Sequence, residues 1–327
     1  MGRRRIRCLN ANGIAAEQIR LVDTREDRRA EARQTHGVEG FADLQGGMDW
    51  GPDVVIVSVP PTAHMDVCLT AARAGKHFFC EVPLSMSLDG TEELTDLVER
   101  QGLVAAPGSQ PPFHPLVKQV KQWLEDPAFG KLLLFNQDWG QYLPDWHPYE
   151  DYRTFYAAKQ GMGGGALDIV PHELVVYYWL TGDRIERLHC RGSHLSSLEI
   201  EGNETWQILA ETRGGVRATL QYDLIQRAVH NVCRFVSEAG TIELDLPGSA
   251  AHGACARRYL ASTGQWEQVT PPDGFEYEQC YVDEIAAFLR CLRGEATWHV
   301  SMATAVDIVR LLVAALESDD RHEWVEV

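Results

Sequence analysis

Asp168 and His172 are the side chains whose types and spacing best suit proton transfer. They stand four residues apart, so on a helix they share one face. Imidazole suits acid–base chemistry because its unperturbed pKa lies close to neutral pH. The preceding run Gly163-Gly164-Gly165 would let the backbone approach a ligand closely. An isolated Asp–His pair at this spacing is more often a structural contact, so these residues alone leave both roles open.

The N-terminal residues carry a second pattern, that of a dinucleotide-binding turn. Such a turn needs a strand, closely spaced glycines, a helix N-terminus for the pyrophosphate and an acid about 20 residues later for the ribose. Gly2 begins a helical segment and Asp23 closes the next strand. We expect Gly2 to be the last glycine of the turn and Asp23 to bind ribose, with the first strand and two glycines absent from the chain. Asp23 favours NAD over NADP, although Arg25 leaves room for the phosphorylated form.

Three successive cations, Arg3-Arg4-Arg5, lie at the start of the same helix. Positive charges at a helix N-terminus oppose the helix dipole, each at a cost of about 0.3 kcal/mol or more. A bound phosphate would remove this conflict, so we interpret the cations as support for a pyrophosphate site. A frayed basic N-terminus is the alternative.

The bulk composition excludes several classes of partner. The net charge of -17, from 30 Lys and Arg against 47 Asp and Glu, repels nucleic acids and anionic membrane surfaces. The eight cysteines show no C-x-x-C pair and no metal-like spacing, so we expect reduced thiols in the cytoplasm and no metal site. We see neither a secretory leader nor an apolar run of the roughly 20 residues that span a bilayer.

The first third of the chain alternates short β-branched runs with helical patterns. Strands are expected at 19–22, 54–59, 77–80 and 103–105, and helices at 25–35, 62–74 and 88–101. Strands that are apolar on both faces and alternate with helices indicate a parallel sheet covered on both sides. We therefore predict an α/β, Rossmann-like dinucleotide-binding domain over residues 1–125.

The pattern changes after an expected helix at 116–124. Strands are expected at 132–138, 185–194, 205–212, 216–224, 232–238 and 241–246, and helices at 167–180, 277–292 and 302–316. Gly214-Gly215 separates two of these strands and favours a hairpin turn. The length of 327 residues also favours two domains. We predict an α+β domain over residues 126–327 with a large, mostly antiparallel open sheet.

Several stretches of the chain resemble the family of glucose-fructose oxidoreductase, inositol dehydrogenase and MocA. They are residues 53–60 with His64, residues 74–85 and 163–168, and the pair His172-Glu173. These stretches occur in the same order as in the family and extend nearly from one end of the chain to the other. Their order together is more specific for the family than any single stretch. The resemblance implies a nicotinamide cofactor across the carboxyl ends of the first-domain strands, and a substrate between the cofactor and the second sheet.

The resemblance also assigns roles to single residues. It implies that His172 takes the proton from a substrate hydroxyl as hydride leaves the same carbon, while Asp168 positions the alcohol and the base. The positions implied to line the cofactor, together with Gly2 and Asp23, are Ser58, Val59, Pro60, His64, Glu81 and Pro83. Residues 143–153 look like a subgroup found with surface-sugar biosynthesis. The substrate candidates are Gln110, Tyr142, Trp146, Tyr152 and Arg153.

Val82 is the main departure from the family pattern, which places a lysine between Glu81 and Pro83. Valine can neither donate a hydrogen bond nor stabilise an alkoxide, and loss of a positioned acid–base group costs about 10² to 10⁴ in rate. Either another cation such as Arg153 substitutes, or the reaction differs, or the protein only binds. Arg153 could equally form a surface ion pair. The Val82-Pro83 bond can be cis or trans, and the sequence does not decide between them.

From these patterns we predict an NAD(P)-dependent oxidoreductase that acts on a hydroxyl or keto carbon of a sugar, sugar nucleotide or cyclitol. The alternative is a non-redox relative that binds a sugar or partner in the same cleft. A cytoplasmic homodimer or homotetramer is expected, since family members commonly pair through the open face of the second sheet. Without its first strand the parallel sheet would lack a central member, so we expect weak cofactor affinity and reduced stability.

Overall fold

The computed structural model describes residues 1–148, 150–246 and 253–327, and these form two compact units. The first unit consists of residues 1–85, 89–110 and 278–303, and the second of residues 86–88, 111–277 and 304–327. The sequence led us to expect a single boundary between residues 125 and 126. In the structure the chain passes from the first unit to the second between Gln110 and Pro111, and a C-terminal segment belongs to the first unit again.

The first unit is built from short parallel strands and the helices that connect them. Its helices are α1 (Gly2–Ala11), α2 (Glu26–His36), α3 (Leu44–Asp49), α4 (His64–Arg73), α5 (Thr91–Gln101) and α8 (Glu278–Leu292). Its strands are β1 (Arg20–Val22), β2 (Glu39–Phe41), β3 (Val54–Val57), β4 (His77–Cys80) and β5 (Ala105–Pro107). This alternation confirms the Rossmann-like domain, although β2 and α3 were not predicted.

The parallel strands of this unit form two sheets. One has the order β1-β2 and the other β3-β4-β5. Val57 pairs with Cys80, and Cys80 pairs with Pro107, so these three strands end at one edge. Among the described residues, no strand pairs with both β1 and β3. Each of these two strands therefore has one edge without a ladder partner. This agrees with the expectation that the sheet lacks a central member.

A buried ion-pair group, Arg5 with Glu81 and Glu284, links three segments of this unit. Arg5 on α1 donates to both carboxylate oxygens of Glu81 at 2.6 and 2.8 Å and to Glu284 on α8 at 2.7 Å. Burial disfavours its charge, yet the two carboxylates outweigh burial and raise the pKa of Arg5. Burial also acts to raise the pKa of Glu81, but Arg5 lowers it below its ordinary value. The residue before Val82 is thus held as a carboxylate.

The second unit contains one large sheet and the helices α6 (Pro115–Glu125), α7 (Ile169–Thr181) and most of α9 (Met302–Arg321). Its strands are β6 (Leu132–Gly140), β7 (Ile185–Ser193), β8 (Thr205–Thr212), β9 (Arg217–Asp223), β10 (His230–Ser237), β11 (Gly240–Asp245), β12 (Cys255–Leu260), β13 (Gln265–Val269) and β14 (Val325–Glu326). Gly215, with φ of 85°, lies in the predicted turn between β8 and β9.

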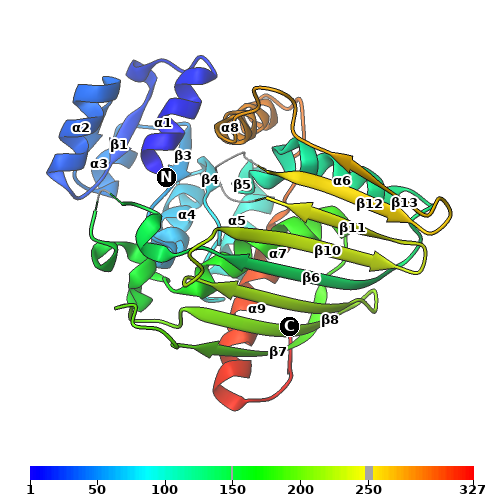
Figure 1. The fold of residues 1–327 in the computed structure, drawn as a ribbon. Helices are drawn as coiled ribbons and strands as arrows, with labels where there is room; N and C mark the ends of the chain where they lie inside the picture. Colours follow the sequence, from blue (N-terminus) through cyan, green and yellow to red (C-terminus); the bar gives the residue numbers. More distant parts are fainter. Residues whose placement is uncertain (149, 247–252) are drawn as a thin grey trace. The chain divides into compact units, whose positions relative to one another are not determined.

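The strand order of the large sheet is β13-β12-β11-β10-β6-β9-β8-β7-β14. Within it only β6 and β9 pair in parallel, which confirms the mostly antiparallel prediction for the described residues. Helices α6, α7 and α9 lie along one face, as Figure 1 shows. Contacts between Phe135 and Tyr177 on α7, and between Cys190 and Ser318 on α9, fix two of them there. No described helix is long and apolar enough to cross a bilayer.

Glu173 is a polar anchor on α7, a helix that is otherwise mostly apolar and buried. Its carboxylate accepts a hydrogen bond from Gln137 on β6, whose amide oxygen accepts from Tyr222 at 2.9 Å. Burial raises the pKa of Glu173 to about 7, while hydrogen bonds from Gln137 and Asn231 act in the opposite direction. Since its polar partners lie on particular strands, this contact sets how α7 is rotated against the sheet.

Replacing Arg5 by methionine should strongly destabilise the first unit. The change leaves Glu81 and Glu284 buried without a cation, and breaking a buried ion pair in this way costs about 3 to 5 kcal/mol. Arg3→Met is the matched control, because Arg3 pairs with Glu31 at the surface and its loss should cost below about 1 kcal/mol. Urea unfolding measures both values. Equal stability of the two variants would contradict the assigned role.

Glu173 should make stability depend on pH. Its folded-state pKa of about 7 exceeds the ordinary 4.5, so folding favours the protonated form between these values. The free energy of unfolding of the wild type should therefore fall by about 2 to 3 kcal/mol relative to Glu173→Gln as pH rises through this window. Denaturant unfolding of both proteins at a series of pH values tests this. A pH-independent difference between them would disprove it.

Candidate functional site

The loops after β3 and β4 bring most of the predicted cofactor positions to one edge of the three-stranded sheet. Ser58, Val59 and Pro60 follow β3, and Glu81 and Pro83 follow β4. The hydroxyl of Ser58 lies 3.4 Å from a carboxylate oxygen of Glu81. Val59 is 38% exposed, so its part of the loop is open to a ligand. This edge is where ligands bind in open parallel sheets.

His64 lies beneath these loops and contacts both. Its ring is only 1% exposed, with Nε2 2.8 Å from the carbonyl oxygen of Val59 and Nδ1 2.6 Å from that of Pro83. The Val82-Pro83 bond is cis. His64, predicted to line the cofactor, is therefore buried and contacts the backbone of two neighbouring loops, and its role toward a cofactor stays a prediction.

The arginines at the start of α1 do not have the role that the sequence suggested. Arg3 pairs with Glu31 at 2.8 Å and Arg4 with Glu278 at 2.9 Å, and Arg5 points into the interior. Carboxylates thus balance these charges without a phosphate, so the cations no longer support a pyrophosphate site, which stays a prediction. Gly2 is the first residue of α1, and a Cβ there would meet nothing within 4 Å.

Asp23 directly follows β1, as the ribose prediction requires. Its carboxylate accepts from the backbone amide of Arg25 at 2.9 Å and lies 3.5 Å from the guanidinium of Arg28. The side chain is half-buried, so a ligand hydroxyl could still reach it. The assignment of ribose binding to Asp23 stays a prediction.

Asp168 and His172 occupy the start of α7. Asp168 is the N-cap residue and is buried, and its Oδ2 accepts from the hydroxyl of Tyr156 at 2.8 Å. The positive end of the helix dipole favours a carboxylate there. His172 lies one turn on, half-buried, with no hydrogen-bond partner among residues 1–148, 150–246 and 253–327. Its ring is therefore available to a substrate. The sequence did not point to Tyr156, because it lies outside the helix that carries Asp168 and His172 and no spacing rule links it to Asp168.

The glycine run before Asp168 packs against the chain's own backbone. A Cβ on Gly164 would lie 2.3 Å from the carbonyl oxygen of Tyr156, and Gly165 has φ of 91°. Ala166 donates to the carbonyl of Asn203 at 2.9 Å. Close packing and positive φ already require glycine here. The glycine run can therefore be explained without a ligand that approaches the backbone.

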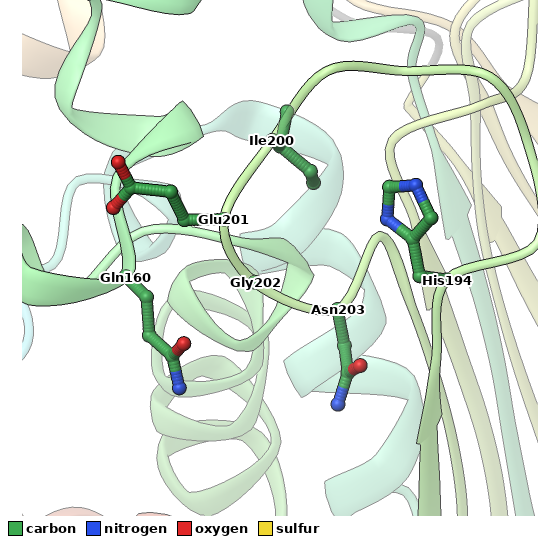
Figure 2. Close-up of a pocket in the computed structure, with 6 residues that line it drawn as sticks. All are labelled: Gln160, His194, Ile200, Glu201, Gly202 and Asn203. Atoms are coloured by element: carbon green, nitrogen blue, oxygen red, sulfur yellow. The ribbon is translucent and has the colours of Figure 1, made fainter.

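A pocket of about 230 Å³ lies beside this glycine run. Figure 2 shows the residues that line it, and they are Gln160, His194, Ile200, Glu201, Gly202 and Asn203. A Cβ on Gly202 would lie 3.6 Å from the carbonyl oxygen of Gly164, which shows how closely the two loops pack. None of the residues predicted from the sequence lines this pocket.

The aromatic substrate candidates lie in packed surroundings. The guanidinium of Arg227 stands 3.5 Å from the ring centroid of Tyr142, so one face of that ring is covered. Trp146 meets Trp139 edge-on, with the ring centroids 6.0 Å apart. The hydroxyl of Tyr152 accepts from the amide of Glu199 at 3.2 Å. Tyr149, in the same stretch, lies outside the described residues.

Arg153 forms surface ion pairs rather than acting as a spare cation. Its guanidinium lies 2.8 Å from both Asp151 and Glu199, and its side chain is 53% exposed. A surface ion pair is the alternative that the sequence had left open for Arg153. A role for Arg153 as a substitute for the lysine missing at Val82 stays a prediction.

Gln110 lies at the end of a loop that the first unit holds firmly. The preceding Ser109 donates its amide to Glu284 at 2.6 Å, and His299 lies 3.0 Å from its carbonyl oxygen. Gln110 itself is half-buried. A role for it in substrate binding stays a prediction.

Two family descriptions match the chain. Residues 1–109 match "Oxidoreductase family, NAD-binding Rossmann fold", and residues 117–243 match "GFO/IDH/MocA C-terminal domain". Together the two stretches make up most of the chain. They are consecutive and fall on the two parts of the fold that the sequence patterns distinguished.

Curated relatives are similar over different lengths. Levoglucosan dehydrogenase of Pseudarthrobacter phenanthrenivorans is 27% identical over 50% of this chain and 42% of its own length. Myo-inositol 2-dehydrogenase of Thermotoga maritima is 26% identical over 57% of each. The chain thus matches about half the length of these two. Inositol 2-dehydrogenase 3 of Saccharopolyspora erythraea is 25% identical over 94% of this chain and 88% of its own length.

Solved structures share the fold. An oxidoreductase domain protein from Kribbella flavida superposes with a TM-score of 0.86, covering 100% of this chain and 96% of its own at 16% identity. Levoglucosan dehydrogenase in complex with NADH and levoglucosan gives a TM-score of 0.82, covering 95% and 90% of the two chains at 18% identity. The order of motifs, the family descriptions and the fold agree, and the chain belongs to the GFO/IDH/MocA family of oxidoreductases.

Proposed function

We propose that this chain is an NAD-dependent dehydrogenase that acts on a hydroxyl group of a sugar or cyclitol, with NADP as the less favoured cofactor. The observation that carries the proposal is the His172 ring, which has no partner among the described residues and lies one turn from the buried carboxylate of Asp168. Relatives named as inositol and levoglucosan dehydrogenases support the substrate class.

The first unit has features that fit the cofactor. Asp23 lies at the end of β1 where it could accept from ribose hydroxyls, and the exposed loop at Val59 and Pro60 offers a surface for the dinucleotide. Glu81 and Pro83 follow the neighbouring strand. NAD, when bound, accepts the hydride that the substrate carbon loses. The residues of this unit bind and orient it.

The second unit supplies the proton chemistry. His172, with a neutral imidazole, takes the proton from the substrate hydroxyl as the carbon–hydrogen bond breaks. The carboxyl group of Asp168 accepts from the hydroxyl of Tyr156 at the start of α7, where a negative charge would stabilise the imidazolium that forms. Glu173 fixes the rotation of the helix that carries both residues.

Val82 supports a second reading, that of a relative that binds sugars without oxidising them. The side chain supplies no charge or hydrogen bond next to the reacting oxygen, where the family pattern has a lysine. Arg153 is held in surface ion pairs and Arg5 in buried ones, so neither compensates directly. An activity screen separates the two readings. NAD is mixed with each member of a panel of sugars and cyclitols, and the formation of NADH is measured.

We expect His172→Asn to lower kcat by about 10² to 10⁴ without changing the Kd for NAD, because the variant removes the base and leaves the first unit intact. Steady-state kinetics and calorimetric titration measure the two quantities. His189→Asn is the control, since His189 lies on β7 near Trp324 and has no assigned role. A His172→Asn enzyme with kcat close to that of the wild type would remove His172 from the mechanism.

Val82→Lys should raise kcat by at least about tenfold if the missing cation limits the reaction, because a positioned acid–base group is worth more than this. Val82 is half-buried, so the longer side chain has a route to solvent. Val82→Met controls for side-chain length. If neither the wild type nor Val82→Lys oxidises any compound of the panel, the binding-only reading replaces the dehydrogenase.

We further infer a cytoplasmic homo-oligomer, a dimer or tetramer. Leu134 and Leu209 are 44% and 49% exposed, and each alternates with buried neighbours, so both lie on the sheet face opposite to α7. Apolar side chains on an open sheet face favour association with a second copy. The cysteines of the described residues are free thiols, which supports a reducing compartment.

A further inference from the structure

His64 connects two loops that end neighbouring strands of the first unit. It is the first residue of α4, and its ring is almost fully buried. Nε2 lies 2.8 Å from the carbonyl oxygen of Val59, and Nδ1 lies 2.6 Å from that of Pro83. Because β3 and β4 pair side by side, the ring bridges the two loops at the edge where those strands end.

The chemistry of these two contacts selects one charge state of the ring. A carbonyl oxygen only accepts hydrogen bonds, so each contact needs an N–H group on the ring. Neutral imidazole has one N–H, and its second nitrogen would then turn a lone pair toward a carbonyl oxygen at hydrogen-bonding distance. The imidazolium has two N–H groups and satisfies both carbonyls. The geometry therefore fits the charged ring.

The surroundings of the ring favour the same state. The carboxylate of Glu81, at the end of β4, is close enough for the charge of His64 to lower its pKa. Arg5 and the N-terminal amine act on the same carboxylate, so His64 shares Glu81 with two other cations. The buried thiols of Cys68 on α4 and Cys80 on β4 interact with each other. Helix α4 also carries Arg73, which is paired with Glu93 on the neighbouring helix α5.

Two effects oppose the charged ring, namely its burial and its place at the N-terminus of α4. A cation there is disfavoured by the helix dipole, but that effect is weaker than two hydrogen bonds from a charged donor. Glu81 adds an attraction of the opposite sign. The imidazolium is therefore the state in which this part of the first unit is fully hydrogen-bonded.

We propose that His64, as an imidazolium, is a positioning residue that ties the loop after β3 to the loop after β4 and so holds both ready for the dinucleotide. The proposal deepens the NAD-dependent function and rests on it for the ligand. Loss of one ring proton breaks one of the two hydrogen bonds and frees one loop. Affinity for NAD should therefore be lower in the form of the protein that has lost this ring proton.

The charge state can be tested without cofactor. In the full chain labelled with ¹⁵N at its histidines, NMR should show both ring nitrogens of His64 in the protonated state at neutral pH, with the signal identified by its loss in His64→Gln. A His64 ring with one unprotonated nitrogen at neutral pH would overturn the proposal. This measurement tests the charge state of His64 even if the wild type binds no NAD. Absence of NAD binding would instead refute the proposed function.

The positioning role is tested by calorimetric titration of NAD between about pH 6 and pH 9, the range around which histidines titrate. His64→Phe removes both hydrogen bonds and should weaken binding by about tenfold or more at the low end of this pH range. His64→Gln keeps an N–H donor and should bind with intermediate affinity and no pH dependence. Both variants are first checked for native circular dichroism.

The matched control is His77→Phe. His77 is a half-buried ring at the opposite end of β4, where Nδ1 accepts from the amide of Val104 at 2.9 Å. This variant should keep both the wild-type affinity and its pH dependence. If folded His64→Phe binds NAD within about twofold of the wild type at every pH, a difference too small for a lost charged hydrogen bond, the positioning role is disproved.

Discussion

A buried positive charge that must be neutralised organises the first unit. Arg5 has almost no exposure to solvent, and its partners come from positions 76 and 279 residues away in the sequence. One carboxylate, Glu81, lies at the end of β4, and the other, Glu284, lies on α8, where it also accepts from the amide of Ser109. The cation therefore fixes α1, two strand ends and a C-terminal helix in one arrangement. The Glu81-Val82-Pro83 turn takes its position from this network.

The second unit solves a related problem with a single carboxyl group and uncharged partners. Helix α7 is apolar on most of its surface, so hydrophobic contact alone would leave its rotation weakly specified. Glu173 removes this freedom, because Gln137 and Tyr222 offer hydrogen bonds at one place on the sheet. Asp168 and His172 share the helix with Glu173, so the same contact determines the direction in which they project. In each unit a buried polar group, rather than an apolar one, decides where the reactive side chains lie.

The sequence predicted what local patterns encode and missed what depends on distant partners. The alternation of apolar strands and amphipathic helices located the main elements, and the four-residue spacing placed Asp168 and His172 on one helix. Short or polar elements were missed, since β2 is three residues long with a central glycine and most of β13 is exposed. Arg3-Arg4-Arg5 was misinterpreted because Glu31, Glu278 and Glu284 cannot be recognised as partners from the sequence. The contact of Tyr156 with Asp168 escaped notice for the same reason.

The interleaving of the two units along the chain bears on how the protein is made. Helix α8 belongs to the first unit but follows most of the second in the sequence. A ribosome synthesises the chain from its N-terminus, so Arg5 and Glu81 emerge long before Glu284. During that interval the guanidinium has only one of its two carboxylates, and the loop at Ser109 lacks its acceptor. Domains that are continuous in sequence can fold as they emerge. Here the first unit can reach its final hydrogen bonding only after nearly the whole polypeptide has been translated.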